Sequence, residues 1–249
     1  MLAPHSKKRF LLVGQFIGAI ALVYGMLAFS LAEWGLVLFL YFVGGCLGGS
    51  ITYHRLLSHK SWKAPAWWEY IGSLCGAVFL IGSPLAWSNN HMAHHRYVDT
   101  DNDPHGPSRL GFWRVQFLSM LYSTDNFKYS VRNLTPFQKS LHHYYEIMHL
   151  GIFAALMIFA GWHITALVYL VPSAVIWHMM SLVNNINHTS LGYVHEAGRD
   201  SSTNNLVLGY LTFGEGWHAN HHLTPAHANF GRAWWEFDLS YQIIRILQK

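Results

Sequence analysis

The uncharged stretch FLLVGQFIGAIALVYGMLAFSL at residues 10–31 decides the fold, together with WGLVLFLYFVGGCLGGSITY at residues 34–53. The hydrocarbon core of a bilayer is about 30 Å thick and a helix rises about 1.5 Å per residue, so roughly 20 apolar residues span it. Only Ala32 and Glu33 separate the two stretches. The pair therefore predicts a hairpin of two membrane-spanning helices.

Two further apolar stretches, at residues 147–162 and 163–183, predict a second hairpin. Pro172 interrupts the latter, and membrane helices tolerate such a proline. A fifth stretch, Trp67 to Trp87, is broken by glycines and by Pro84, which favours an interfacial or re-entrant segment. We expect one all-α integral membrane domain over residues 1–249, with four transmembrane helices and a helical cytoplasmic cap at residues 54–146 and 184–249.

The basic residues predict the orientation. All 16 Lys and Arg lie before the first stretch, between residues 55 and 139, or from residue 199 onward, and neither hairpin turn carries one. Loops that stay in the cytoplasm carry the Lys and Arg. We expect both termini and the cap of this multi-pass protein on the cytoplasmic side, in the bacterial inner membrane rather than the endoplasmic reticulum.

Composition excludes several classes of protein. Hydrophobic residues make up 52% and charged residues 11%, which excludes a disordered or highly solvated chain. Cys46 and Cys75 lie in apolar runs, so neither a disulfide scaffold nor a cysteine-based zinc site is expected. The net charge of +4 suits anionic lipid or an acidic redox partner. Nucleic acid is not expected, because no basic stripe interleaves with aromatic residues.

The 18 histidines outnumber Lys plus Arg and indicate metal binding. They gather in HRLLSH (54–59), HMAHH (91–95) and HANHH (218–222), with NNINH at 184–188. Residues three and four apart share a helix face, so each HxxHH triplet can direct three rings to one locus. The spacing of five in HRLLSH puts its rings roughly 140° apart on an ideal α-helix. Those two rings would then serve different metals or need a helix end between them.

Nine imidazoles and one amide in these motifs exceed what one ion can use, so we expect a centre of two metal ions. Imidazole suits zinc, copper, iron and nickel, so the ligands alone leave the metal open. Two redox-capable ions beside a membrane indicate oxygen chemistry on a lipid-soluble substrate. The ten candidate ligands are His54, His59, His91, His94, His95, Asn184, His188, His218, His221 and His222.

Other histidines have simpler explanations. His178 lies within the fourth apolar stretch and is a functional candidate by position, although a hydrogen bond to a neighbour would explain it equally. Seven more are expected to be surface or satisfied core residues: His5, His142, His143, His149, His163, His195 and His227.

The motifs HRLLSH, HMAHH with the following DTDNDPH, NNINH, and LTFGEGWHANHH resemble the histidine boxes of the membrane-bound fatty acyl desaturases, above all the delta-9, stearoyl-CoA type. The resemblance runs from about Gly44 to Leu247. It implies a di-iron centre held by the nine histidines, with Asn184 reaching its iron through water, and O2 as co-substrate. It also implies a cis double bond, expected at delta-9, in a saturated acyl-CoA or acyl-lipid. Zinc can replace iron on purification.

The sequence departs from the family pattern at three places. Ala219 stands where Asn is common, Arg114 and Val115 replace a Ser-His pair, and Met180 and Ser181 replace a Thr-Trp pair. None of these changes removes a candidate ligand. The change at Met180 and Ser181 falls where the acyl tunnel of the family is shaped, so it bears on chain length and double-bond position.

Groups around the ligands and the source of electrons complete the expectation. A ligating imidazole usually donates its other N–H to an acid or a carbonyl. The sequence offers six candidate acids: Asp99, Asp101, Asp103, Glu196, Asp200 and Glu215. Neither a dinucleotide-binding GxGxxG nor a haem or CxxC motif occurs. Electrons are therefore expected from an external donor of the ferredoxin or cytochrome b5 type.

Two alternatives remain open from the sequence. A di-iron hydroxylase of lipids, alkanes, sterols or carotenoids would use the same motifs and differ in its product. A metal transporter or store, which is not an enzyme, would need polar ligands in the middle of the spans rather than at their ends.

Overall fold

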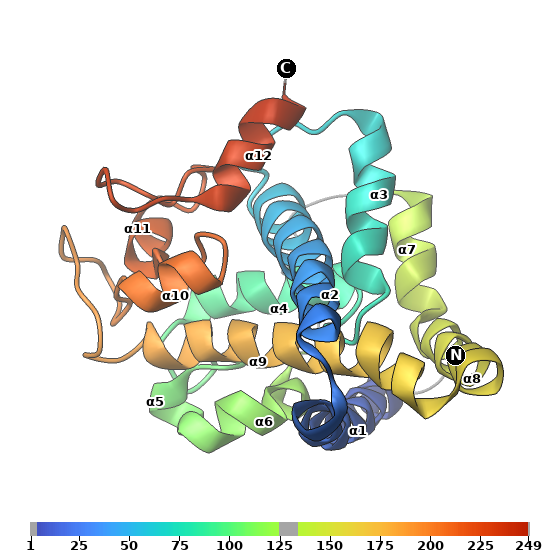
Figure 1. Cartoon of the computed structure of the whole chain (residues 1–249). Coiled ribbons are helices and arrows are strands. Elements are labelled where there is room, and N and C mark those ends of the chain that lie inside the picture. Colours follow the sequence, from blue (N-terminus) through green and yellow to red (C-terminus); the bar gives the residue numbers. More distant parts are fainter. Residues whose placement is uncertain (1–3, 125–133, 249) are drawn as a thin grey trace.

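The computed structural model describes residues 4–124 and 134–248, and within these ranges every regular element is a helix (Figure 1). The described residues add one isolated antiparallel bridge, between Tyr193 and Asn204. The predicted all-α class is therefore confirmed for these ranges. The elements are α1 (Pro4–Ala28), α2 (Leu31–Tyr41), η1 (Phe42–Ser58), α3 (Ala66–Ala77), α4 (Pro84–Tyr97), α5 (Pro107–Leu110), α6 (Phe112–Tyr122), α7 (Pro136–His143), α8 (Tyr145–Thr165), η3 (Ala166–Leu170), α9 (Val171–Ile186), α10 (Leu206–Leu211), α11 (His218–Leu223) and α12 (Leu239–Leu247).

Three continuous helical runs among the described residues are long and apolar enough to cross a membrane: residues 7–28, 31–58 and 145–186. The first two match the predicted hairpin, and the capping box of Ser30 and Glu33 begins the second helix. The third run contains one break, at Gly161, whose φ of 74° and ψ of 179° lie outside helical geometry. The break falls next to the predicted junction of the third and fourth spans, so the four-span arrangement remains a prediction.

The segment η1 continues α2 as a π-helix of 17 residues. Two side-chain hydrogen bonds in this segment also join residues five apart. The Thr52 hydroxyl donates to the Leu47 carbonyl at 2.7 Å, and the Ser58 hydroxyl donates to the Tyr53 carbonyl at 2.7 Å. In a π-helix each hydrogen bond joins residues five apart, so such residues come onto nearly one face. The sequence predicted an α-helix here.

The glycines of η1 allow a neighbouring helix to approach its backbone. A Cβ built on Gly48 would lie 2.3 Å from the Gly76 nitrogen of α3. No side chain fits such a gap, so the two backbones touch directly. The stretch predicted as interfacial or re-entrant forms α3, a turn with Gly82 at φ 100°, and the start of α4 at Pro84. Its depth in a membrane remains a prediction.

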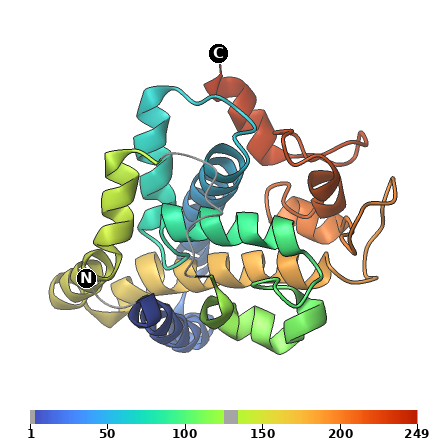
Figure 2. The same cartoon turned by 180° about the vertical axis from the view of Figure 1, so that it is seen from behind.

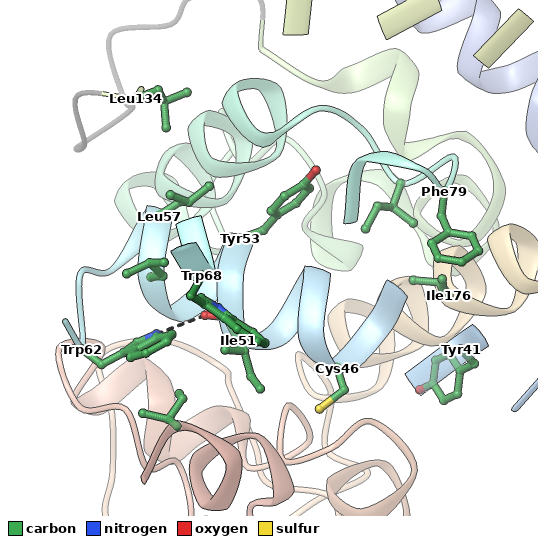
Figure 3. Packing of buried hydrophobic residues seen from close by; sticks show 13 residues of the cluster. Tyr41, Cys46, Ile51, Tyr53, Leu57, Trp62, Trp68, Phe79, Leu134 and Ile176 are labelled. Atoms are coloured by element: carbon green, nitrogen blue, oxygen red, sulfur yellow. Dashed lines mark hydrogen bonds between the residues drawn. The ribbon is translucent and has the colours of Figure 1, made fainter. Parts of the chain in front are cut away.

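The largest hydrophobic core surrounds η1 (Figure 3). Ile51, Tyr53 and Leu57 of η1 are fully buried there, and Trp62 and Trp68 cover them. The Trp62 indole nitrogen donates to the Ile51 carbonyl at 3.2 Å, so this buried polar group is satisfied. Within a helix of membrane-spanning length, close packing of such side chains rather than transfer out of water stabilises the contact. The core therefore holds η1 in one position.

Helices α4 and α9 frame the region that carries the polar motifs. From behind, α4 lies across the molecule near η1, which it contacts (Figure 2). Ser83 caps α4 by accepting a hydrogen bond from the Ala86 N–H, and Pro84 occupies the first turn. Helix α9 contacts α1, α2 and α6. The helices that carry these histidine motifs are thus held in place by the hydrophobic core and by their N-terminal caps.

Candidate metal centre

One group of imidazoles, the five-histidine cluster, consists of His54, His59, His91, His95 and His221, whose ligand nitrogens all lie within 4.8 Å of one another. The Nε2 atoms of His59 and His91 are 2.7 Å apart, and those of His95 and His221 are 2.9 Å apart. Two nitrogens that bind one ion at about 2.1 Å and at right angles lie about 3.0 Å apart. The spacing therefore fits one metal ion.

A second group, the four-histidine cluster, consists of His94, His188, His218 and His222 and meets the same 4.8 Å limit. The Nε2 atoms of His188 and His218 are 3.1 Å apart. The two clusters adjoin, because the rings of His95 and His222 stack with centroids 4.4 Å apart. The histidines therefore form two neighbouring clusters, and the two-metal centre remains a prediction.

The spacing-five pair of HRLLSH lies within one cluster. The rings of His54 and His59 are 5.0 Å apart, and the His59 N–H donates to the His54 carbonyl at 3.1 Å. The π-helix brings residues five apart onto one face, whereas the predicted α-helix would separate them. The prediction offered two alternatives, and the structure shows the second of them. Helix η1 ends at Ser58, between the two histidines, and both rings belong to the five-histidine cluster.

Each HxxHH triplet is divided between the clusters. In α4, His91 and His95 join the five-histidine cluster and His94 joins the other. In α11 the division is reversed, because His218 and His222 join the four-histidine cluster and only His221 joins the five-histidine cluster. The prediction that each triplet points at one locus is wrong, because each of the two helices contributes rings to both clusters.

Buried neighbours hold α11 in place. The Trp217 indole donates to the Phe237 carbonyl at 3.1 Å, and a Cβ on Gly209 would meet its ring at 2.4 Å. Within the helix, the Asn220 amide donates to the Phe230 carbonyl at 2.9 Å and to Glu236 at 3.0 Å. The hydrogen bonds of Trp217 and Asn220 therefore fix the helix that carries the histidines of GWHANHH.

Four of the six predicted acids contact a cluster histidine. Asp103 lies 2.9 Å from the Nδ1 of His94, and Asp200 lies 3.0 Å from that of His222. An oxygen of Asp99 lies 3.6 Å from the Nδ1 of His188.

The fourth acid, Glu215, binds the Nδ1 of His54. Each contact fixes the ring so that Nε2 faces the cluster. The other two predicted acids make no such contact, since Asp101 is exposed and Glu196 pairs with Arg232 at 3.5 Å.

The protonation states suit a metal cation. Burial, the largest cause in each case, lowers the pKa of His91, His95, His218, His221 and His222 well below the ordinary value, so these rings are neutral at pH 7.

The acids are ionised. The neighbouring imidazole of His188 lowers the pKa of Asp99 to about 2. Burial opposes the ionisation of Glu215, but the charges of His54 and Arg55 outweigh it and bring its pKa to about 2.

Unsatisfied nitrogens show that the donor set fits a metal. Within residues 4–124 and 134–248, the buried Nε2 atoms of His94 and His222 have no hydrogen-bond partner. Leaving such a group unsatisfied costs about 1–3 kcal/mol. A bound cation would satisfy both atoms, because neutral imidazole nitrogen is a common metal ligand.

Arg55 and His105 belong to the site but were not singled out from the sequence. The fully buried guanidinium of Arg55 binds Glu215 and Asp238 and stands 3.7 Å over the Phe230 ring. His105 stacks on His94 with centroids 4.5 Å apart, and burial lowers its pKa to about 3. Two features of the sequence could have indicated these residues. Arg55 is a cation within the histidine motif HRLLSH, and His105 is the histidine of the segment DTDNDPH.

An apolar cavity of about 170 Å³ reaches both clusters, at His54 and His91 of one and His218 of the other. Asn184, the tenth predicted ligand, is half-buried on α9 and lines this cavity. Met180 and Ser181 also line it, at the place where the sequence departs from the family pattern. The cavity thus brings an apolar space against the candidate metal ligands.

The histidines given simpler explanations lie outside both clusters. His149 contacts the Tyr169 hydroxyl at 2.7 Å, and His178 contacts the Gln116 amide at 3.1 Å. His142 contacts Ser83, His163 contacts Glu33, and His195 contacts Glu236. His143 and His227 are exposed, and the side chain of His5 lies outside the described residues.

Apolar helices of membrane-spanning length, joined to two adjoining imidazole clusters, define a membrane metalloprotein. The sequence profile of the family described as "Fatty acid desaturase" matches residues 9–246. The chain belongs to the fatty acid desaturase family and is an oxidoreductase of lipid metabolism.

Curated relatives agree with this assignment. An sn-1 stearoyl-lipid 9-desaturase of Anabaena variabilis is 36% identical over 88% of this chain and 82% of its own length. An sn-2 palmitoyl-lipid 9-desaturase of Nostoc sp. (strain 36) is 34% identical over 88% and 80%. An icosanoyl-CoA 5-desaturase of Limnanthes douglasii is 33% identical over 87% and 63%. The resemblance seen in the histidine motifs is confirmed.

Proposed function

We propose that the protein is an O2-dependent acyl desaturase that inserts a cis double bond at delta-9 of a saturated acyl chain. The observation that carries the proposal is the apolar cavity that ends against histidines of both clusters. Two relatives are named as 9-desaturases of lipid-linked acyl chains, and one as a desaturase of an acyl-CoA. An acyl-lipid or acyl-CoA is therefore the proposed substrate.

Two iron ions are the proposed cofactor. The five-histidine cluster would hold one ion and the four-histidine cluster the other, with Asn184 reaching its ion through water. When bound, the iron pair would supply the oxidising power for the removal of hydrogen from unactivated carbon, which side chains alone lack. Asp99, Asp103, Asp200 and Glu215 would orient the ligating rings.

The protein's own contribution is positioning and the exclusion of water. The cavity walls include the large apolar side chains of Tyr41, Ile81, Trp87, Trp177 and Phe213. Such walls would hold a methylene chain beside the clusters and keep water out. The single domain over residues 1–249 would place the cap on the cytoplasmic side of four membrane helices, with both termini in the cytoplasm of a bacterial cell.

Electrons would come from a separate protein of the ferredoxin or cytochrome b5 type. A turnover converts CH2–CH2, O2, two electrons and two protons into CH=CH and two waters. Two of the four electrons that reduce O2 come from the acyl chain, and the donor supplies the other two. Two one-electron deliveries therefore accompany each double bond.

Expression with iron and a donor in a host without its own delta-9 desaturase tests the proposal. Gas chromatography with mass spectrometry should show new monounsaturated chains with the double bond at delta-9, absent from the His94→Ala control. Hydroxylated products would instead identify a hydroxylase. Metal accumulation without any new acyl product would favour a transporter or store.

A further inference from the structure

His105 is a histidine of the apolar cavity that belongs to neither cluster. It lines that cavity, and it is a member of neither the five-histidine nor the four-histidine set. Within residues 4–124 and 134–248, its Nε2 atom is buried and has no hydrogen-bond partner. A buried nitrogen without a partner destabilises a folded protein, so this atom calls for an explanation in terms of function.

The segment DTDNDPH holds this ring against a candidate ligand. The His105 backbone N–H donates to the Asp103 carboxylate at 3.0 Å, and the Arg109 guanidinium donates to the Asp103 carbonyl at 2.8 Å. The ring stacks on that of His94, with centroids 4.5 Å apart and an interplanar angle of 28°. The ligand atoms of His94, Asp103 and His105 all lie within 4.8 Å of one another. Backbone and ring contacts therefore fix the orientation of His105.

His105 lies near three of the four rings of the four-histidine cluster. The ring of His94, on which it stacks, contacts that of His188 with centroids 4.9 Å apart. Burial, the largest cause, and the charges of His94 and His188 lower the pKa of His105 to about 3. His105 in turn contributes to the low pKa of His218, for which burial is again the largest cause. At pH 7 the ring of His105 is therefore neutral, with one N–H to donate and one lone pair to accept.

The four-histidine cluster offers one nitrogen fewer than the five-histidine cluster. Of two ions with equal coordination numbers, the one in the four-histidine cluster would therefore take one further small ligand. Asn184 lies one helical turn before His188 on the chain and, like His105, lines the apolar cavity. The water proposed above between Asn184 and its ion is a ligand of this kind. A buried water typically makes about three hydrogen bonds, so it needs a partner besides the ion and Asn184.

We propose that His105 donates a hydrogen bond from Nε2 to the small polar ligand, water or an anion, that a metal ion in the four-histidine cluster would carry. The inference rests on the two metal ions of the function proposed above. His105 is then a partner of the ligand and not itself bound to the metal. The role requires the tautomer with the proton on Nε2, and the hydrogen bond would satisfy the buried nitrogen.

Azide, a small anion that binds ferric iron, is the probe, and its affinity is measured by spectroscopic titration of iron-loaded, full-length protein without acyl substrate. His105→Phe keeps an aromatic ring against His94 but removes both nitrogens. Its azide affinity should fall about tenfold through the loss of one hydrogen bond to a charged group, at wild-type iron content. His105→Gln, which can still donate, should recover part of the loss. His143→Phe, an exposed control outside both clusters, should match wild type within about twofold.

Three results would overturn the proposal. Wild-type azide affinity in His105→Phe would show that no hydrogen bond from His105 reaches the bound anion. Loss of iron from both His105→Phe and His105→Gln would make His105 a metal ligand or a support of the fold. Iron-loaded wild type that binds no azide would show that the centre takes no further small ligand.

Two provisions keep the test decisive. If His105→Phe does not fold, His105→Leu takes its place with the same expectation, because it too lacks a donor. Wild-type protein that binds iron and azide but forms no unsaturated product would contradict the proposed function. The azide affinities of the variants would still judge the role of His105, because they are measured without turnover.

Discussion

The two histidine clusters differ in the charge that supports them. Three carboxylates, Asp99, Asp103 and Asp200, contact rings of the four-histidine cluster. Within residues 4–124 and 134–248, the five-histidine cluster has one, Glu215 on His54, and the guanidinium of Arg55 neutralises it. A carboxylate on the far nitrogen makes an imidazole a stronger ligand and favours a more highly charged ion. The two proposed ions are therefore inequivalent, and the four-histidine cluster should hold the more oxidisable one.

The largest expected effect comes from removing a ligand of the four-histidine cluster. His94→Ala should abolish desaturation and lower the metal content, because neighbouring rings cannot replace the lost nitrogen. His143→Ala, an exposed histidine outside both clusters, serves as the control and should retain full activity. Fatty-acid analysis at matched membrane abundance measures both. Wild-type product levels from His94→Ala would refute the ligand assignment.

Next in size is the loss of the charge that neutralises Glu215. Arg55→Met leaves the carboxylates of Glu215 and Asp238 without their cation, and breaking such a buried pair costs about 3–5 kcal/mol of folding stability. Removing the exposed partner of Glu196, in Arg232→Met, should cost no more than about 1 kcal/mol. Thermal unfolding of the purified proteins measures the difference. Similar melting temperatures for the two variants would show that Arg55 is not a structural cation.

Two neighbouring aspartates sharpen the comparison of the clusters. Asp103→Asn keeps the size of the side chain but removes the charge on His94, and changes of this kind lower metal affinity about 10–100-fold. Asp101→Asn should leave it unchanged, because Asp101 is exposed and contacts neither cluster. Competition with a chelator, followed by elemental analysis, measures the affinity. Equal metal loss in both variants would argue against a role for the contact with His94.

The smallest expected effect concerns a histidine outside the clusters. Burial, assisted by the charges of Lys7 and His143, lowers the pKa of His142 to about 4 in the folded protein. The unfolded chain takes up this proton near pH 6.5, so the stability that neutral His142 contributes is complete above pH 6.5 and declines as the pH falls towards 4.

Between pH 6.5 and 5.5 this loss is at most about 1 kcal/mol, because His142 is only half-buried. The melting temperature of metal-free protein should fall more for wild type than for His142→Gln over this interval. Equal decreases for the two proteins would contradict the assignment.

The sequence predicted the helical class and the acids that contact the rings better than the division of the rings between two sites. Polar residues in the motif regions limit the choice of acids, so Asp103 and Glu215 could be found from their positions. The π-helix was not predicted from the sequence, and the close approach of its Gly48 to Gly76 joins residues far apart in the chain. That helix decides that His54 and His59 share a cluster.

A count of metal ions in active protein tests the central claim most directly. Protein purified with iron supplied, and shown to form unsaturated product, is measured by elemental analysis against amino-acid analysis of the same sample. The two clusters predict two metal ions per chain, with zinc counted if it replaces iron. Fully active protein with one ion per chain would contradict the account, because one of the clusters would then have no metal to hold.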